Sequence, residues 1–414
     1  MGEIKNIGLV STWLHRGATY VTINYAKLFQ PKMNVFVFGR GGEYFDETLI
    51  VDGVNVHKGA RIDSKDGVNP KEIVKWISDN HIDVVIWNEQ RDVTAICYAK
   101  KVVPSVMHGA YIDYYREDTV ESFGVYDFLI CNTKRHYSVF SWYPQCFYIP
   151  WGCDTSLYAP KKREYDGNKI VFFHSMGMSN RKGTNVLVKT FIANNLGASG
   201  AKLVIHTQIN IDSIIAKEEA EKYNIEIIEK TVAAPGLYHL GDVYVYPAKL
   251  DGLGLTLYEA ISCGLPVIAT DAEPMNEVIN ESNGRLVKVK KTYSRSDGYY
   301  WPLSEIDEES LFLAMKYYID RADSLPEISK SVRNDAVNNW ELSLRKVNLE
   351  NMLKSVKSLD NRTACEQYLA AKKASEKREK RVAFTHLFVP QKVFSLFKEW
   401  QVNRKYKNKK AENR

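Results

Sequence analysis

Short runs of apolar, often β-branched residues recur in the first third of the chain, and stretches with helical spacing separate them. The runs are IGLV at 7–10, VFVF at 35–38, VVIW at 84–87, SVM at 105–107 and FLIC at 128–131. Continuously apolar strands that alternate with helices are typical of a parallel sheet covered on both faces. The pattern therefore predicts an α/β unit at the start of the chain.

The same alternation begins again after a polar stretch at 154–168. Its runs are IVFF at 170–173, LVI at 203–205, IEII at 225–228, VYVY at 243–246 and VIA at 267–269. Two such series predict two doubly wound domains that face each other across a cleft. Ligands of these sheets bind at the carboxyl ends of the strands, so the loops that follow the strands are the candidate contacts.

Length and composition agree with two domains. The chain has 414 residues, of which 45% are hydrophobic, and this is enough for two full cores. No apolar run reaches the roughly 18 residues of a membrane-spanning helix, and the chain start leads into a strand without the pattern of a signal peptide. We expect a cytoplasmic protein. The six cysteines form no C-x-x-C pair, which predicts reduced thiols and no zinc site.

Positive charge gathers at the end of the chain. Residues 361–414 hold 15 Lys and Arg against 5 Glu, a surplus of 10, which leaves the first 360 residues at −4 because the whole chain carries +6. Aromatic and aliphatic residues recur at helical spacing on both sides of Pro390. An apolar face flanked by cations favours an interfacial membrane helix over residues 381–414. The alternative is that this face packs on the body or on a second subunit.

The stretch DGLGLTLYEAISCGLPV at 251–267 follows one of the predicted strands. Gly252 and Gly254 leave backbone N–H groups uncovered, and the residues after them are typical of the first turns of a helix. A helix start with free N–H groups is an anion site. The spacing therefore indicates an anionic ligand beside two carboxylates, Asp251 and Glu259.

This stretch resembles the E-x7-E segment of the large retaining glycosyltransferase family with the GT-B fold, often called family 4. Three further segments resemble motifs of that family in the same order: IPWGCD at 149–154, RKG at 181–183 and WE at 340–341. The resemblance implies two Rossmann-like domains that face a central cleft. The expected division is an acceptor domain over 1–152, a nucleotide-sugar domain over 153–335, a helix at 336–360 that crosses back, and the basic amphipathic tail over 361–414.

The resemblance also implies an activity. A family member transfers a hexose from a nucleotide diphosphate sugar, here UDP- or GDP-linked, to a glycan or lipid-linked glycan acceptor, with retention of the anomeric configuration. Surface polysaccharide assembly on the cytoplasmic face of the membrane is the expected setting, with an anionic membrane surface and no nucleic acid as partner. Backbone amides and cations stabilise the charge on the departing phosphate. We therefore expect no metal and no other cofactor.

The donor-binding residues follow from the motif. The resemblance places the diphosphate against the start of the predicted helix and against two cations, and it places the ribose hydroxyls on Glu259. The residues concerned are Leu253, Gly254, Leu255, Thr256, Arg181 and Lys182. Lys182 is also expected to act in catalysis, because it would face the leaving phosphate. Gly177 stands where many relatives carry a further Arg, so that Arg181 takes over this role in the R-K-G form of the motif.

Three further residues complete the expected site. Asp251 would hold hydroxyls of the transferred sugar, although most relatives carry Glu at this position and an Asp before a Gly is also a common turn. Gly17, in the loop after the first strand, would offer its amide to the diphosphate. His108, at the predicted end of a strand, matches the histidine that lines the sugar pocket of the family.

Two other functions fit the same motifs. A nucleotide-sugar epimerase of this architecture would convert its donor without an acceptor. A non-catalytic partner subunit of another glycosyltransferase would bind the nucleotide sugar and show no turnover with any acceptor. Product formation in the presence and absence of acceptor separates these functions from a transferase.

Overall fold

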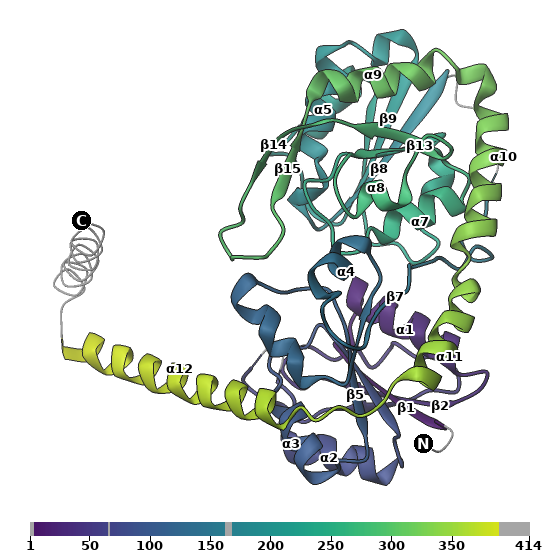
Figure 1. Ribbon diagram of the computed structural model, residues 1–414. Helices are drawn as coiled ribbons and strands as arrows, with labels where there is room; N and C mark the ends of the chain where they lie inside the picture. The colour runs from purple at the N-terminus through teal and green to yellow at the C-terminus, as the bar shows by residue number, and fades with distance from the viewer. Residues whose placement is uncertain (1–3, 65–66, 162–167, 389–414) are drawn as a thin grey trace, which may run out of the picture. The chain divides into compact units, whose positions relative to one another are not determined.

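Two parallel sheets, each with helices on both faces, form the body of the protein, as the computed structural model in Figure 1 shows. The structure describes residues 4–64, 67–161 and 168–388, with the backbone alone for 381–388. The body extends to Leu359, and the residues from Asp360 onward form a separate unit.

The first sheet has seven strands in the order β3-β2-β1-β4-β5-β6-β7, and all neighbours are parallel. The strands are β1 (Asn6–Ser11), β2 (Asn34–Gly39), β3 (Asn55–Lys58), β4 (Val84–Asn88), β5 (Met107–Tyr111), β6 (Phe128–Cys131) and β7 (Cys146–Tyr148). The helical segments that connect them are α1 (Gly17–Phe29), α2 (Pro70–Asp79), α3 (Thr94–Val102), the 3-10 segment η1 (Glu117–Val125) and α4 (Lys134–Phe140).

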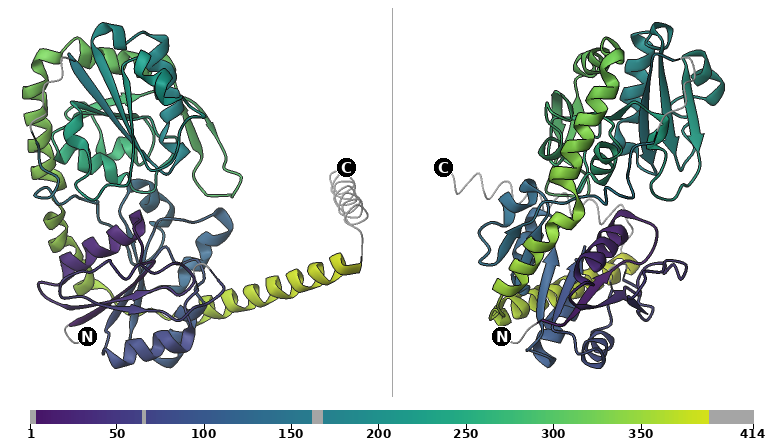
Figure 2. Two further views of the ribbon diagram at one scale, coloured as in Figure 1. Left: turned by 180° about the vertical axis from the view of Figure 1, so that it is seen from behind. Right: turned by 90° about the vertical axis from the view of Figure 1, so that its right-hand side faces the viewer.

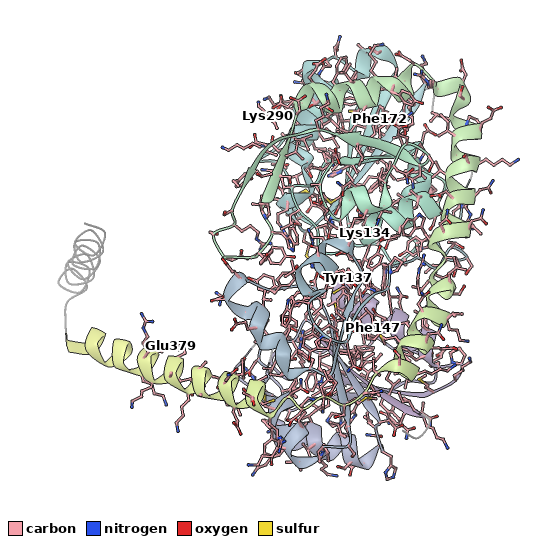
Figure 3. All side chains as sticks on the ribbon, viewed as in Figure 1. Lys134, Tyr137, Phe147, Phe172, Lys290 and Glu379 are labelled. Carbon is pink, nitrogen blue, oxygen red and sulfur yellow. The ribbon has the colours of Figure 1, made fainter. Side chains whose placement is uncertain are left out.

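The second sheet has six strands in the order β10-β9-β8-β11-β12-β13, again all parallel. They are β8 (Ile170–Gly177), β9 (Ala201–Thr207), β10 (Ile225–Glu229), β11 (Val243–Tyr246), β12 (Val267–Thr270) and β13 (Gly284–Val287). The helical segments include η2 (Asn180–Lys182), α5 (Thr184–Ala193), α6 (Lys217–Lys222), α7 (Leu255–Ser262), α8 (Met275–Val278) and α9 (Glu308–Ile319). Phe172 of β8 lies inside this domain, whereas Lys290 lies at its surface (Figure 3).

An antiparallel hairpin, β14 (Val289–Tyr293) and β15 (Leu303–Ile306), extends from the second domain. After α9 the chain runs through α10 (Leu325–Asp335) and α11 (Arg345–Ser355) back to the first domain. There the Lys357 N–H donates to Gln145 Oε1 at 2.8 Å and the Leu359 N–H donates to Asp127 Oδ1 at 2.9 Å. Figure 2 shows α10 and α11 along one side of both domains. The domain limits at 152, 335 and 360 stay predictions.

The predicted fold class is confirmed, with one error in a strand. All the predicted runs but one lie within strands, whereas SVM at 105–107 precedes β5 for most of its length. The Val106 N–H donates to Val103 O in a turn that contains Pro104, so the strand begins only at Met107. His108 therefore occupies the second position of β5 and not the end of a strand.

The separate unit begins with α12 (Arg362–Phe388), whose side chains from 373 to 380 are exposed. Residues 389–414 and the side chains of 381–388, which carry the predicted membrane segment, lie outside the described residues. No helix within the described part of the chain is both long and apolar enough to cross a membrane.

Candidate active site

The start of α7 forms the centre of the candidate site. Gly254 precedes the helix with φ at +75°, a conformation that an L side chain rarely adopts. Among the described residues no side chain caps this helix end, so its first N–H groups stay available to a ligand. Leu253 packs in the core, whereas Leu255 and Thr256 line a cavity. Of the predicted residues 253–256, Leu253 thus packs in the core, whereas Leu255 and Thr256 belong to a helix start with free N–H groups.

Gly17 lies opposite, as the first residue of α1. A Cβ atom at Gly17 would lie 3.8 Å from Leu255 Cδ1, so the starts of α1 and α7 approach each other across the two domains. No described side chain caps α1 either. The structure therefore brings together two uncapped helix starts. The positive ends of both helix dipoles lie close to each other there.

Lys182 and Asp251 form an ion pair beside this region. Lys182 Nζ lies 2.7 Å from Asp251 Oδ2, and the Tyr246 hydroxyl donates to the same oxygen while it accepts from Lys182. Burial alone would raise the pKa of the Asp251 carboxyl. The Lys182 charge, with hydrogen bonds from Lys182, Tyr246 and the Gly252 N–H, outweighs burial and lowers that pKa to about 2. Asp251 is therefore a carboxylate at any physiological pH.

Backbone geometry explains the glycine of the R-K-G segment. Gly183 has φ at +80°, and a Cβ atom there would lie only 2.0 Å from Pro247 O. The close approach keeps η2 against the loop after β11 and so keeps Lys182 beside Asp251. Arg181 is exposed, and its carbonyl accepts the Lys249 N–H at 2.7 Å. Gly177, which stands in place of an Arg of the relatives, lines the cavity.

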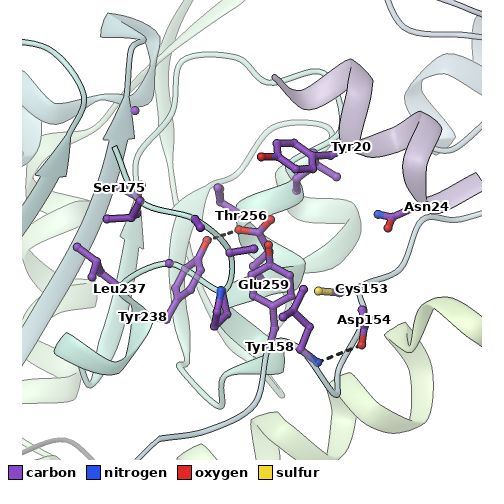
Figure 4. A pocket seen from close by; sticks show the side chains of 18 of the residues that line it. Tyr20, Asn24, Cys153, Asp154, Tyr158, Ser175, Leu237, Tyr238, Thr256 and Glu259 are labelled. Atoms are coloured by element: carbon purple, nitrogen blue, oxygen red, sulfur yellow. Dashed lines mark hydrogen bonds between the residues drawn. The ribbon is translucent and has the colours of Figure 1, made fainter. Parts of the chain in front are cut away.

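Glu259 borders a cavity of about 340 Å³ that both domains line (Figure 4). Glu259 Oε2 accepts from the Tyr238 hydroxyl at 2.5 Å, and Tyr158 donates a second hydrogen bond. Burial raises the pKa of the Glu259 carboxyl, and the two tyrosine hydrogen bonds oppose this shift. A carboxylate accepts about four hydrogen bonds, so Glu259 keeps capacity for hydroxyl groups of a ligand.

The cavity wall combines apolar and polar groups. From the first domain α1 contributes Tyr20 and Asn24, and from the second domain the loop Val232–Tyr238 lies along the other side. Phe173 and Ser175 of β8 complete this side. A pocket of this kind, mostly apolar with a few polar groups, is typical of small-molecule sites.

His108 does not line the described cavity. It is fully buried at the second position of β5, and its Nδ1 accepts from Trp87 Nε1 at 3.1 Å. Its N–H donates to Asp127 Oδ2 at 2.7 Å. Burial and, to a lesser extent, the Lys100 charge lower the pKa of His108 to about 3, so the ring is neutral. The predicted place at the carboxyl end of a strand is wrong, because β5 continues for three more residues.

Asp113, which follows β5, lies beside Gly252 of the second domain instead. A Cβ atom at Gly252 would lie 2.5 Å from Asp113 Oδ1, and Asp113 shares a hydrogen bond with Glu89. Burial, the Glu89 charge and this hydrogen bond raise the pKa of Asp113 well above its usual range. Glu89 has φ at +51° and is ion-paired with Arg16 at 2.8 Å. Two neighbouring carboxyl groups, Asp113 and Glu89, thus lie near Gly252.

Arg135 connects the two domains from the start of α4. Its guanidinium donates to the carbonyls of Asp251 at 2.7 Å, Gly252 at 3.1 Å and Glu273 at 2.9 Å. The sequence indicates Asp113 only as one of several residues after His108 that could face an acceptor or pack in the loop, and it gives no prediction for Glu89 or Arg135. Their common signal is that each follows one of three neighbouring strands, β4, β5 and β6, at the carboxyl edge of the first sheet.

Comparison with known proteins agrees with this architecture. Residues 167–295 match the family described as glycosyl transferases group 1. A probable sucrose-phosphate synthase of Thermosipho melanesiensis is 26% identical over 198 residues, which are 42% of this chain and 44% of that protein. The chain thus spans less than half the length of this curated relative.

Two solved structures share the fold at low sequence identity. A glycosyltransferase from Rickettsia africae has a TM-score of 0.67 at 15% identity, with 86% of this chain and 100% of that chain covered. HepE of Anabaena, solved in complex with UDP-glucose, has a TM-score of 0.65 at 14% identity, with 85% and 100% covered. The chain therefore adopts the GT-B fold and contains, over residues 167–295, a segment that matches the glycosyl transferases group 1 family.

Proposed function

We propose that this protein is a retaining glycosyltransferase of the kind called family 4. It would transfer a hexose from a UDP- or GDP-sugar to a glycan or lipid-linked glycan acceptor in surface polysaccharide biosynthesis. One observation carries the proposal: the uncapped start of α7, the Lys182–Asp251 pair and Glu259 surround one region of the cleft. The similarity to the group 1 family and to a fold that binds UDP-glucose in HepE supports it.

Each group has a chemical task in this proposal. The diphosphate lies at the start of α7, where N–H groups and the helix dipole favour negative charge. Lys182 and Arg181 neutralise the charge that develops on the leaving phosphate, with the Gly17 amide opposite. Glu259 accepts the ribose hydroxyls beside the apolar wall of the cavity, and Asp251 accepts hydroxyls of the sugar. The cations and amides make a metal unnecessary.

The transfer itself needs an acceptor hydroxyl close to the anomeric carbon. We propose a front-face displacement, in which the bond from that carbon to the phosphate oxygen breaks while the acceptor oxygen bonds on the same face. The departing phosphate takes the acceptor proton. The contacts of Arg135 and of the β14–β15 hairpin hold the two domains together and so exclude water from this step.

The proposed setting is the cytoplasmic face of a membrane, with residues 381–414 on the lipid surface. The basic composition of that segment motivates this part of the proposal. Vesicles that contain anionic lipid should bind the full chain and release it at high salt. Equal vesicle binding after deletion of 381–414 would contradict the membrane role and leave the transferase proposal intact.

Thermal unfolding with a panel of nucleotides tests the donor site. UDP, GDP and ADP, free and as their glucose and mannose conjugates, are added in the presence of EDTA. Stabilisation by about 2.7 kcal/mol is expected from one nucleotide class at 100 times its dissociation constant. Glu259→Gln should weaken it, because the neutral amide is a poorer acceptor for hydroxyls.

Glu308→Gln is the matched control, since Glu308 is exposed on α9 and ion-paired with Lys189. It should leave the nucleotide effect unchanged. If no nucleotide diphosphate stabilises the wild type, the proposal fails. Release of nucleotide that depends on an acceptor then distinguishes a transferase from an epimerase and from a partner subunit that only binds the donor.

A further inference from the structure

A shallow hollow of about 690 Å³ lies outside the donor cavity, between η1, α4 and the connection of the β14–β15 hairpin. We call it the aromatic groove and define it by Trp142, Tyr300 and Trp301 with the carboxylates of Glu117 and Glu121. Trp142 is 58% exposed and Tyr300 is 42% exposed. Large aromatic side chains normally bury most of their surface, so such an exposed group indicates a binding surface.

The aromatic rings of the groove are held in place. Trp301 Nε1 donates to the Tyr115 hydroxyl at 2.6 Å, and the Tyr300 N–H donates to Tyr115 O at 3.1 Å. The Tyr300 and Trp301 rings meet edge-on with centroids 5.4 Å apart. A surface whose side chains are already ordered loses little conformational entropy when a ligand binds.

Both domains build the groove. Trp142 follows α4 of the first domain, whereas Tyr300 and Trp301 belong to the connection between β14 and β15 of the second domain. Figure 1 shows the hairpin reaching toward the first domain, where Tyr299 forms a β-bridge with Arg116. The Tyr299 ring also stacks on Tyr114 with centroids 5.1 Å apart. The hairpin thus completes a surface that neither domain provides alone.

Arg135 connects the groove to the candidate active site. Its guanidinium carbon lies 5.3 Å from the centroid of the Trp301 ring, while its nitrogens donate to the carbonyls of Asp251 and Gly252. One side chain thus touches both the groove and the loop that would hold the transferred sugar. A ligand that extends from the reacting centre along this side of the cleft would reach the aromatic rings.

The chemistry of the groove selects a class of ligand. Aromatic faces offer apolar area to the C–H faces of sugar rings, and carboxylates accept hydrogen bonds from sugar hydroxyls. Glu117 and Glu121 repel anions. We infer that the aromatic groove binds the acceptor glycan through neutral sugar rings that lie beyond the ring that reacts. This inference rests on the proposed function and adds the position and class of its second substrate.

Oligosaccharide binding to the full chain tests the inference. The probes are neutral di- to hexasaccharides of glucose, galactose and mannose, with oligogalacturonates as the anionic comparison, and the readout is calorimetry or saturation-transfer NMR. At least one neutral series should bind more tightly as its length increases, and the anionic series should bind more weakly. Trp142→Ala and Tyr300→Ala should each weaken binding about tenfold, as the loss of a stacking contact predicts.

Control variants separate stacking from damage to the fold. Trp142→Phe keeps an aromatic face and should retain most of the affinity. Leu313→Ala removes a 54% exposed apolar side chain on α9 and should change nothing. In every variant the nucleotide should stabilise the protein as in the wild type.

The outcomes distinguish the two proposals. If the wild type binds a nucleotide diphosphate but no oligosaccharide, or if Trp142→Ala and Tyr300→Ala bind oligosaccharides as the wild type does, the inference about the groove is wrong and the donor site stands. If the two variants instead lose binding of phosphatidylcholine vesicles alone, the groove is a lipid surface and the inference is also wrong. If no nucleotide diphosphate binds the wild type, the proposed function itself fails.

Discussion

The two faces of the cleft obtain their polar groups in different ways. On the second domain, Asp251, the uncapped helix start and Glu259 come from one continuous stretch, with Lys182 added from η2. On the first domain, Glu89, Asp113 and Arg135 follow three different strands, which only the sheet order β4-β5-β6 brings together. The polar groups of the second domain thus come mainly from one short motif, whereas those of the first domain are brought together by the order of the strands in the sheet.

This difference suggests a division of roles. A contiguous motif fixes short backbone distances, such as those between N–H groups at a helix start, and suits the diphosphate that every nucleotide sugar carries. A face assembled from separate loops can change one group at a time. We expect substitutions in the motif at 251–259 to abolish donor use, and substitutions of Glu89 or Asp113 to affect the acceptor step alone.

The largest effect is expected from Lys182→Ala. Loss of the ammonium removes a cation that the proposed function places at the leaving phosphate, and it leaves Asp251 without its ion-pair partner. Acceptor-dependent release of nucleotide should fall about 100- to 1,000-fold in kcat/KM. Lys189→Ala is the control, because Lys189 lies exposed on α5 and pairs only at the surface with Glu308. A Lys182→Ala enzyme that keeps more than about a tenth of the wild-type rate would contradict the assigned role.

A smaller effect is expected on the other face, from Asp113→Ala. The Asp113 carboxyl lies beside Gly252 of the motif, and burial with the Glu89 charge raises its pKa, which favours the protonated form that donates a hydrogen bond. Loss of this donor should lower kcat/KM for transfer about tenfold, with the nucleotide dissociation constant unchanged. Asp113→Asn keeps a donor of similar shape and should retain most of the rate. If Asp113→Ala also weakened nucleotide binding, the proposed division of roles between the two faces would be wrong.

The same carboxyl gives a dependence of stability on pH. An unfolded Asp has a pKa of about 3.9, whereas the folded pKa of Asp113 is raised. Between the two values the folded state holds more protons, so the free energy of unfolding falls as pH rises. Asp113→Asn lacks this contribution and should gain stability relative to the wild type as the pH rises above about 4. Parallel denaturation profiles of the two proteins would contradict the raised pKa.

The contrast between the faces also explains what the sequence could predict. Runs such as VVIW at 84–87 mark buried central strands because they are continuously apolar. The edge strands β3, β7 and β13 gave no such signal, because most of their residues are half-buried or exposed, whereas the edge strand β10 was predicted from IEII at 225–228. The same holds for the site. The motif at 251–259 fixes its own geometry through backbone distances, but the meeting of Asp113 with Glu89 depends on which strands are neighbours, and no short spacing encodes that.

The smallest effect on catalysis is expected from a substitution of His108. It lies one strand position from the start of β5 and contacts Trp87 and Asp127, not the cleft. His108→Asn keeps an acceptor near the position of Nδ1, so donor binding and transfer should stay within about twofold of the wild type. A loss of transfer comparable to that of Asp113→Ala would indicate that His108 does line the sugar pocket.

His108 should instead affect how the free energy of unfolding depends on pH. Its folded pKa of about 3 lies below the ordinary value of 6.5, so the unfolded state binds more protons between these values and stability falls as pH falls through this window. From pH 7.5 to pH 5 this contribution amounts to about 2 kcal/mol. His108→Asn removes it, and urea denaturation at the two pH values should show a smaller loss of stability in the variant. An equal loss in both proteins would mean that His108 is not neutral and buried as its contacts imply. In that case His108 would have to be counted among the polar groups of the cleft and not among those of the core.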